Sequence, residues 1–366
     1  MSYGVLFLGE ADTVPNSVIA DSLSKSLEKA LSEDDHNDCQ HLLNFLRENG
    51  VLPFEWNAQI GNRFALLPIE SRTEYLLFRY RLYRNRHQRL NSRFPLYVLI
   101  EPASVCNLRC TMCFQVDKSF TKKPYMGVMD FDLFKKVIDQ LVDGGTKAIT
   151  FASRGEPTLH PRLAEMLNYC RGKFLEIKLN TNGTKLDDEL IRSILDNGVH
   201  ELVFSIDSHI AEIYEKIRVK SNFELVLENI RRFNNVRKEY GNSQTHTRVS
   251  GVKIYEHQDM ERFTEFFRPI VDSVAYVEIE NRWDTYSNSV QETADNPCDY
   301  LWERMYVWFD GRCNPCDVDY KSRLQVGDVN VSTIKEIWDS PGYRELRDDH
   351  LSGRRLAHVP CDRCGV

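Results

Sequence analysis

The chain has 366 residues, of which 42% are hydrophobic and 28% charged, and its formal net charge is −7. These proportions are typical of a globular protein with one large domain or two to three ordinary ones. The acidic balance argues against a general nucleic-acid binder, which would be basic. The amino-terminal segment lacks the cationic flank of a signal peptide, and no 18 apolar residues run together. We therefore expect a cytoplasmic protein without membrane or nucleic-acid partners.

Residues 1–95 are predicted to be mostly helical. Apolar residues recur at helical spacing in 17–32 and 37–50, and 74–90 reads as a long helix. Seven arginines lie between Arg72 and Arg93, interleaved with Tyr and Leu. Such a surface can face phosphate groups. The interpretation that we favour is an amphipathic helix packed on the next domain, with a solvated charged face.

From residue 97 onward, short apolar runs alternate with amphipathic segments. Strands are predicted at 97–103, 147–153, 174–183, 200–207, 245–254 and 273–280. Helices are predicted at 131–145, 160–172, 187–198 and 259–270, with a further helical region broken near residue 221 and ending near 240. This alternation predicts a parallel α/β sheet. The pattern alone does not distinguish an open doubly wound sheet from a barrel.

The rhythm changes again after residue 281. Residues 305–320 predict two short strands around Asp310-Gly311, which is a strong hairpin signal. Residues 333–354 are predicted to be helical, and the chain ends with the pair Cys361 and Cys364. We expect three regions: an amino-terminal helical extension of unassigned role (1–95), an α/β core (96–280) and a small cysteine-bearing module (281–366).

Clustered cysteines are the main chemical signal. Reducing compartments keep thiols free, so grouped thiols in a cytoplasmic protein point to metal. Cys39 and Cys170 stand alone, whereas the other eight cysteines form two groups, 106/110/113 and 298/313/316/361/364. The first group follows the first predicted strand, where parallel sheets place their ligands. A structural zinc site needs four ligands, and a redox dithiol needs no third cysteine. Three thiolates suit an iron–sulfur cluster with one iron left open.

The motif CNLRCTMC (106–113), together with motifs after later strands, resembles the radical S-adenosylmethionine (SAM) superfamily over about residues 95–280. The resemblance implies a partial (β/α)6 TIM-like barrel. It also implies that Cys106, Cys110 and Cys113 hold a [4Fe–4S] cluster whose open iron is chelated by SAM. One electron from the cluster then cleaves SAM, and the resulting 5′-deoxyadenosyl radical abstracts hydrogen from an unactivated C–H bond.

The same resemblance assigns SAM contacts to the strand ends. Gly155 and Glu156 match the Gly-Glu-Pro motif that holds the SAM ammonium group. Arg154 replaces the usual preceding glycine, and we expect it either to face the substrate or to cap the loop. The other expected contacts are Met112, Asn182, Ser205, Asp207 and Arg218. Read without the resemblance, these would be an apolar residue, a turn, two helix caps and a surface arginine.

The second cysteine group can form a closed site from Cys298, Cys316, Cys361 and Cys364. Ligand count alone allows either zinc or [4Fe–4S]. The surrounding residues resemble the SPASM/twitch extension of radical SAM enzymes. Because there are fewer cysteines than in a full SPASM domain, the resemblance implies the twitch form with one auxiliary [4Fe–4S] cluster. The spacing is similar to that of radical SAM dehydrogenases that oxidise an aminocyclitol alcohol.

Cys313 is left over, three residues before Cys316. We favour the interpretation that it is a small buried hydrophobe. The sharper hypothesis, drawn from radical SAM epimerases, is that its thiol donates a hydrogen atom to a substrate radical.

The combined motifs imply a radical SAM oxidoreductase with two [4Fe–4S] clusters and SAM, reduced by a flavodoxin or ferredoxin. We expect a carbohydrate-like small-molecule substrate, such as a sugar or sugar nucleotide, and dehydrogenation or epimerisation. The alternative is a peptide-modifying maturase. Maturases of this kind often carry a winged-helix and β-hairpin amino-terminal domain, so a helical extension argues against that alternative. A non-enzymatic iron–sulfur scaffold is disfavoured by the intact SAM motifs.

Overall fold

The computed structural model describes residues 14–29, 32–241, 244–278, 285–290 and 296–364. Its centre is a nine-stranded sheet with the order β11-β10-β9-β1-β3-β4-β5-β7-β8. Six parallel strands follow one another in chain order, as the alternating sequence predicts. They are β1 (Tyr97–Ile100), β3 (Ala148–Phe151), β4 (Glu176–Thr181), β5 (Glu201–Ser205), β7 (His246–Lys253) and β8 (Ser273–Glu278). The mixed α/β architecture with a mostly parallel sheet is that of the predicted partial barrel.

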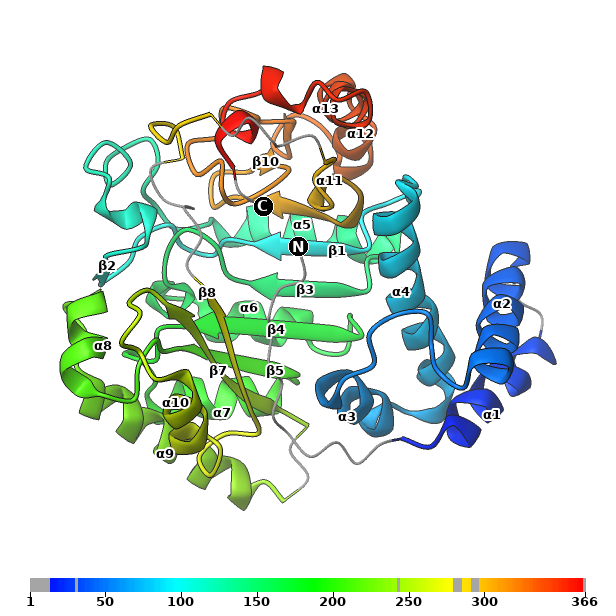
Figure 1. Ribbon diagram of the computed structural model, residues 1–366, viewed down its shortest axis with the longest axis horizontal. Coiled ribbons are helices and arrows are strands. Elements are labelled where there is room, and N and C mark those ends of the chain that lie inside the picture. The colour runs from blue at the N-terminus through cyan, green and yellow to red at the C-terminus, as the bar shows by residue number, and fades with distance from the viewer. Residues whose placement is uncertain (1–13, 30–31, 242–243, 279–284, 291–295, 365–366) are drawn as a thin grey trace.

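The helices between these strands cover one face of the sheet (Figure 1). They are α5 (Phe131–Gly144), α6 (Leu163–Cys170), α7 (Asp188–Asp196), α9 (Phe223–Glu239) and α10 (Met260–Phe267). Alternate strand residues such as Ile177 and Leu179 enter the hydrophobic core beneath them. The residues between, such as Lys178 and Asn180, therefore line the concave interior of the barrel. The predicted break near residue 221 is confirmed, because β6 (Arg218–Val219) separates α8 (Ala211–Ile217) from α9.

Four helices form the amino-terminal region: α1 (Asn16–Leu27), α2 (Glu33–Asn49), α3 (Ala58–Leu66) and α4 (Ile69–Gln88). They lie beside the amino ends of the strands in Figure 1 and share a second hydrophobic core that includes Ala148 of β3. The arginines of α4 are less solvated than we expected. Arg79 pairs with Glu176 of the barrel, Arg84 with Asp38 of α2, and both Arg86 and Arg89 with Asp299.

The carboxy-terminal region extends the sheet beyond β1. The predicted hairpin is present, with β9 (Arg304–Val307) antiparallel to β10 (Arg312–Asn314), and β11 (Gly327–Asp328) follows. Gly311 adopts a φ of 93° in the turn, a conformation that glycine tolerates best. The predicted helical stretch divides into α12 (Ile334–Trp338) and α13 (Pro341–Leu351), because Ser340 caps a new helix. The short helix α11 (Tyr300–Glu303) precedes β9.

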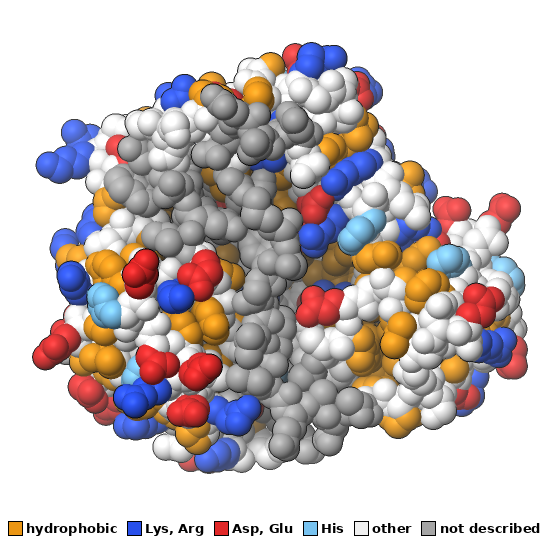
Figure 2. Space-filling model, viewed as in Figure 1, with side chains coloured by type: hydrophobic (Ala, Val, Ile, Leu, Met, Phe, Trp, Pro, Cys, Tyr) orange, Lys and Arg blue, Asp and Glu red, His pale blue; other side chains and the backbone are white. Residues whose placement is uncertain are grey.

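On the visible face of the molecule, acidic and basic side chains are interspersed rather than gathered by sign (Figure 2). Among the described residues, the longest helices are too polar or too short to span a bilayer.

Candidate active site

The loop that follows β1 carries the first three cysteines. Its short strand β2 (Arg109–Cys110) pairs with β6, which places Cys110 opposite Arg218. Burial, with a smaller contribution from neighbouring thiols, raises the pKa of Cys106 to about 11 and that of Cys113 to about 12. The three thiols are thus close enough to influence one another electrostatically. Free thiols here would be protonated, so a bound metal centre would have to stabilise them as thiolates.

The number of thiols on this loop bears on the kind of metal centre that they can hold. Across the described ranges, no three His, Cys, Asp or Glu side chains are arranged to hold one ion. A zinc ion with bonds of about 2.3 Å would draw its sulfurs together around one point. In a [4Fe–4S] cluster each thiolate binds a different iron, so the sulfurs stand farther apart. The three thiolates of this loop are one short of a closed zinc site and match a cluster that leaves one iron without a protein ligand.

Gly155 makes the cysteine loop and the strand β3 loop fit together. A Cβ atom at this position would lie 2.4 Å from the carbonyl oxygen of Ala103 and 2.5 Å from that of Val105. The amide of Glu156 donates to the same Val105 carbonyl, at 2.9 Å. Because Gly155 has no side chain, the backbone that leads into Cys106 can pack directly against it. We expected Gly155 to lie against SAM, and in this structure its open side makes room for the cysteine loop.

The carboxylate of Glu156 is buried between the ends of β3 and β4. Its Oε1 accepts hydrogen bonds from the hydroxyls of Thr158 and Thr181, each at 2.7 Å, and Oε2 accepts from the amide of Asn182, also at 2.7 Å. Burial raises its pKa despite these bonds. The carboxylate is therefore held in one orientation in a place where a cationic ligand group would offset its desolvation.

Asn182 connects this carboxylate to the cysteine loop. Its Nδ2 donates to Oδ1 of Asn107, at 2.9 Å, and its Oδ1 accepts from the amide and hydroxyl of Thr184. Gly183 has a φ of 75°, so the turn expected without the resemblance is also present. Asn182 consequently lies next to the residue after Cys106.

Asp207 and Arg218 form a buried ion pair, with 2.6 Å between Oδ2 and Nε. Asp207 also accepts from the amide of Val252, at 2.9 Å, and Arg218 Nη1 lies 4.0 Å from the Sγ of Cys110. The pKa of Arg218 is raised, since the attraction of Asp207 outweighs burial. Arg218 is therefore not a surface residue. Ser205 and Met112 are half-buried at the same end of the barrel.

The second cysteine group also comes together, apart from one member. Burial raises the pKa of Cys316 well above its ordinary value, and Cys361, Cys298 and Cys364 are close enough to contribute to this rise. Arg355 donates to the carbonyl oxygens of Cys361, at 3.3 Å, and Cys364, at 3.0 Å. These four thiols from three separate segments fit one closed cluster site.

Cys313 does not join this group. It is fully buried in the main hydrophobic core, and its Sγ lies 3.8 Å from the carbonyl oxygen of Gly311. Burial raises the pKa of its thiol far above the ordinary range. This environment argues against the hydrogen-donor hypothesis and favours the interpretation as a buried hydrophobe.

Arg154 occupies neither of the positions that we expected. Its side chain is fully buried and forms an ion pair with Glu101, which itself follows β1. Glu101, Gln115 and Arg355 were missed as site residues, because none belongs to a motif. A charged residue directly after an apolar strand, as at Glu101, was the available signal.

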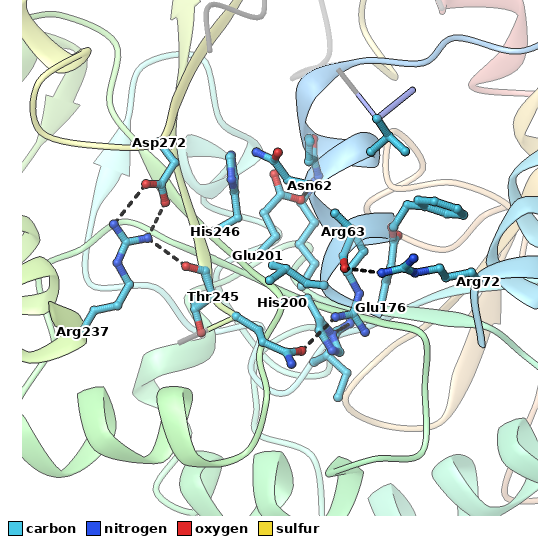
Figure 3. A pocket seen from close by; sticks show the side chains of 18 of the residues that line it. Asn62, Arg63, Arg72, Glu176, His200, Glu201, Arg237, Thr245, His246 and Asp272 are labelled. Carbon is cyan, nitrogen blue, oxygen red and sulfur yellow. Dashed lines mark hydrogen bonds and ion pairs between the residues drawn. The ribbon is translucent and has the colours of Figure 1, made fainter. Parts of the chain in front are cut away.

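A large cavity lies at the opposite end of the barrel (Figure 3). It measures about 710 Å³ between α3 and the amino ends of β4, β5 and β7, and its walls include Arg63, Glu176, Lys178 and Glu201. Lys178 and Asn182 are four residues apart, which is about 13 Å along an extended strand. The cavity is thus separated from the cysteine loop by most of the barrel's depth.

Comparison with known proteins agrees with the geometry. Residues 100–267 match the Radical SAM superfamily, and residues 298–365 match SPASM, an iron–sulfur cluster-binding domain. These domains imply SAM and [4Fe–4S] clusters, including an auxiliary one.

Two curated relatives and one solved structure illustrate the breadth of the similarity. The Tungsten-containing aldehyde ferredoxin oxidoreductase cofactor-modifying protein of Pyrococcus furiosus is 38% identical over 112 residues, 30% of either chain. The Cysteine-type anaerobic sulfatase-maturating enzyme of Clostridium novyi is 24% identical over 332 residues, covering 74% of this chain and 85% of the relative. The fold resembles that of BtrN in complex with AdoMet and 2-DOIA, with a TM-score of 0.50 and 18% identity over 76% of this chain and 95% of that one.

Proposed function

Because the chain belongs to the radical SAM superfamily and carries a SPASM iron–sulfur domain, we propose that it dehydrogenates a carbohydrate-like small molecule. The observation that carries the choice of substrate is the polar barrel interior. Asn180 of β4 and Ser250 of β7 alternate with core residues near the carboxyl ends of their strands, and Oδ1 of Asn180 is buried without a hydrogen-bond partner among the described residues. Polar groups on the concave face near the cysteine loop suit a substrate rich in hydroxyl groups better than an apolar one.

The residues at the carboxyl ends of the strands would bind SAM. Glu156 would accept a hydrogen bond from the ammonium group, while Met112, Asn182 and Ser205 would contact the rest of the molecule. The pair of Asp207 and Arg218 would fix the side of the site next to Cys110. When bound, SAM and the clusters supply the radical that removes a hydrogen atom and an acceptor for the second electron.

Dehydrogenation is favoured over epimerisation by the two cysteine environments. Epimerisation needs a hydrogen donor beside the substrate, and Cys313 is enclosed in the core. Dehydrogenation needs an electron acceptor, and Cys298, Cys316, Cys361 and Cys364 form a group that fits an auxiliary cluster.

Anaerobic reconstitution with SAM and reduced flavodoxin tests the proposal. We expect about eight irons per chain, formation of 5′-deoxyadenosine, and a product that lacks two hydrogens relative to one of the supplied sugars, cyclitols or sugar nucleotides. Deuterium uptake from solvent without a change in oxidation level would instead show epimerisation. Mass spectrometry distinguishes the two products.

Peptide modification is the second candidate, supported by the sulfatase-maturating relative that matches 74% of this chain. Incubation with cysteine- and serine-containing peptides tests it in parallel. A modified peptide together with unreacted sugars would replace the first proposal by the second.

A further inference from the structure

Arg154 and Glu101 form an ion pair whose side chains are both completely buried. Nε of Arg154 donates to Oε2 of Glu101 at 2.7 Å, and Nη2 donates to Oε1 at 2.5 Å. This two-pronged arrangement uses the planar shape of the guanidinium group. The SAM contacts described above do not include either residue, so the pair needs another explanation.

The remaining guanidinium nitrogen of Arg154, Nη1, contacts the carboxy-terminal region. Nη1 of Arg154 donates to the carbonyl oxygen of Tyr320 at 2.9 Å. The guanidinium also lies 4.1 Å from the ring centre of Trp308, and Glu101 accepts from the amide of Phe309 at 3.2 Å. Both members of the pair thus hold the segment that surrounds the second cysteine group.

Tyr320 in turn contacts the first cysteine loop. It follows Cys316 by four residues, and its ring stacks on Phe114, next to Cys113, with 5.0 Å between centroids. Its hydroxyl donates to Asp117 at 2.9 Å. On the other side, Gln115 donates to the backbone carbonyl of Arg154 at 2.6 Å. The backbone of Arg154 therefore binds the first loop, whereas its side chain binds the second.

From these contacts we propose that Arg154 is a positioning residue that fixes the auxiliary-site loop (316–320) against the SAM-site loop (113–117). The environment of the auxiliary cluster then depends on this side chain, while that of the SAM-site cluster does not. The inference rests on the auxiliary cluster but not on the identity of the substrate.

The substitution Arg154→Lys tests the proposal. A lysine keeps the charge beside Glu101, but its single ammonium group cannot reproduce the fork and also reach Tyr320. Losing one buried hydrogen bond to a charged group should lower the equilibrium constant for docking of the 316–320 loop about 10- to 100-fold. Arg162→Lys is the matched control, because Arg162 lies eight positions away and pairs with Glu165 at the surface.

The measurements are iron per chain, the paramagnetic resonance spectra of the reduced protein and the midpoint potential of each cluster. In Arg154→Lys we expect the auxiliary cluster either to be lost, with iron falling from about eight toward about four per chain, or to change its potential. The SAM-site spectrum should persist, and Arg162→Lys should match the wild type. Unchanged potentials for both clusters, or equal loss of both, would overturn the proposal.

A second variant covers the case in which Arg154→Lys does not fold. The double substitution Glu101→Gln and Arg154→Met removes both charges, so no buried charge is left unpaired. In the reconstituted protein, a chelator should then remove the auxiliary iron about tenfold faster than in the wild type, while the SAM-site iron is lost at the wild-type rate. Equal rates of auxiliary iron loss in the two proteins would contradict the inference. None of these readouts uses substrate, so their failure and that of the proposed dehydrogenation are distinguishable.

Discussion

The two cysteine sites are built in different ways. Cys106, Cys110 and Cys113 lie within eight residues on one loop, which is clamped by the pairing of β2 with β6. The auxiliary thiols come from three segments between residues 298 and 364, and side chains such as Arg355 hold these segments together. The first site is therefore mainly local, whereas the second depends on tertiary packing. We expect substitutions to affect the two sites separately.

Replacing one cysteine ligand at a time should give the largest difference between the roles of the two sites. Cys110→Ser should abolish SAM cleavage, because a cluster with one missing thiolate cannot present its open iron correctly. Cys361→Ser should leave 5′-deoxyadenosine formation within a few-fold of the wild type and abolish the oxidised product. Chromatography of both products checks this comparison. Loss of SAM cleavage in Cys361→Ser would show that the sites are interdependent.

Glu156→Gln should weaken SAM binding without changing the auxiliary site. The amide keeps the shape of the side chain but removes the charge that would pair with an ammonium group. A bond to a charged group contributes about 1.5–3 kcal/mol, so we expect SAM affinity to fall about 10- to 100-fold. Equilibrium binding to the reconstituted protein measures the effect, with Glu165→Gln as the surface control. Equal affinity in the two variants would exclude Glu156 from the SAM contacts.

Asp299→Asn probes the link between α4 and the auxiliary site. Asp299 follows Cys298 and pairs with Arg86 and Arg89, which hold its pKa below the usual range. The pairs are partly exposed, so the loss should be about 1 kcal/mol or less of unfolding free energy. We expect a small increase in auxiliary iron loss to a chelator. Asp38→Asn, which breaks the pairs of Asp38 with Arg81 and Arg84 within the amino-terminal helices, should leave that rate unchanged.

Cys313→Ala should have the smallest effect on chemistry. The thiol packs in the core, so the substitution should lower the unfolding free energy by about 1 kcal/mol through the space it leaves. Turnover and product should not change. Denaturant unfolding and product analysis measure the two quantities. Loss of product with unchanged stability would restore the hydrogen-donor hypothesis.

Much of the architecture could be predicted because its signals are local. Alternating patterns such as that around Ile177 and Leu179 placed the six barrel strands, and Asp310-Gly311 placed the hairpin. The predicted strand boundaries were less accurate, because the last residue of a strand depends on which residues of the neighbouring strand pair with it. Nothing in residues 304–307 indicates that β9 pairs in parallel with β1. That choice depends on which sheet edge is open in the folded chain.

The sequence by itself determined the residue types that can bind two clusters and SAM, because thiolate spacing and strand-end motifs are properties of short segments. Only the tertiary structure decided the partners of the buried charges. Arg154 pairs with Glu101, which is 53 positions away in the sequence, and Arg86 pairs with Asp299, which is 213 positions away. A charge buried in a protein must be paired, but its partner is chosen by the packing of whole elements. For the same reason Cys313, three residues from a cluster ligand, lies in the core instead of the site.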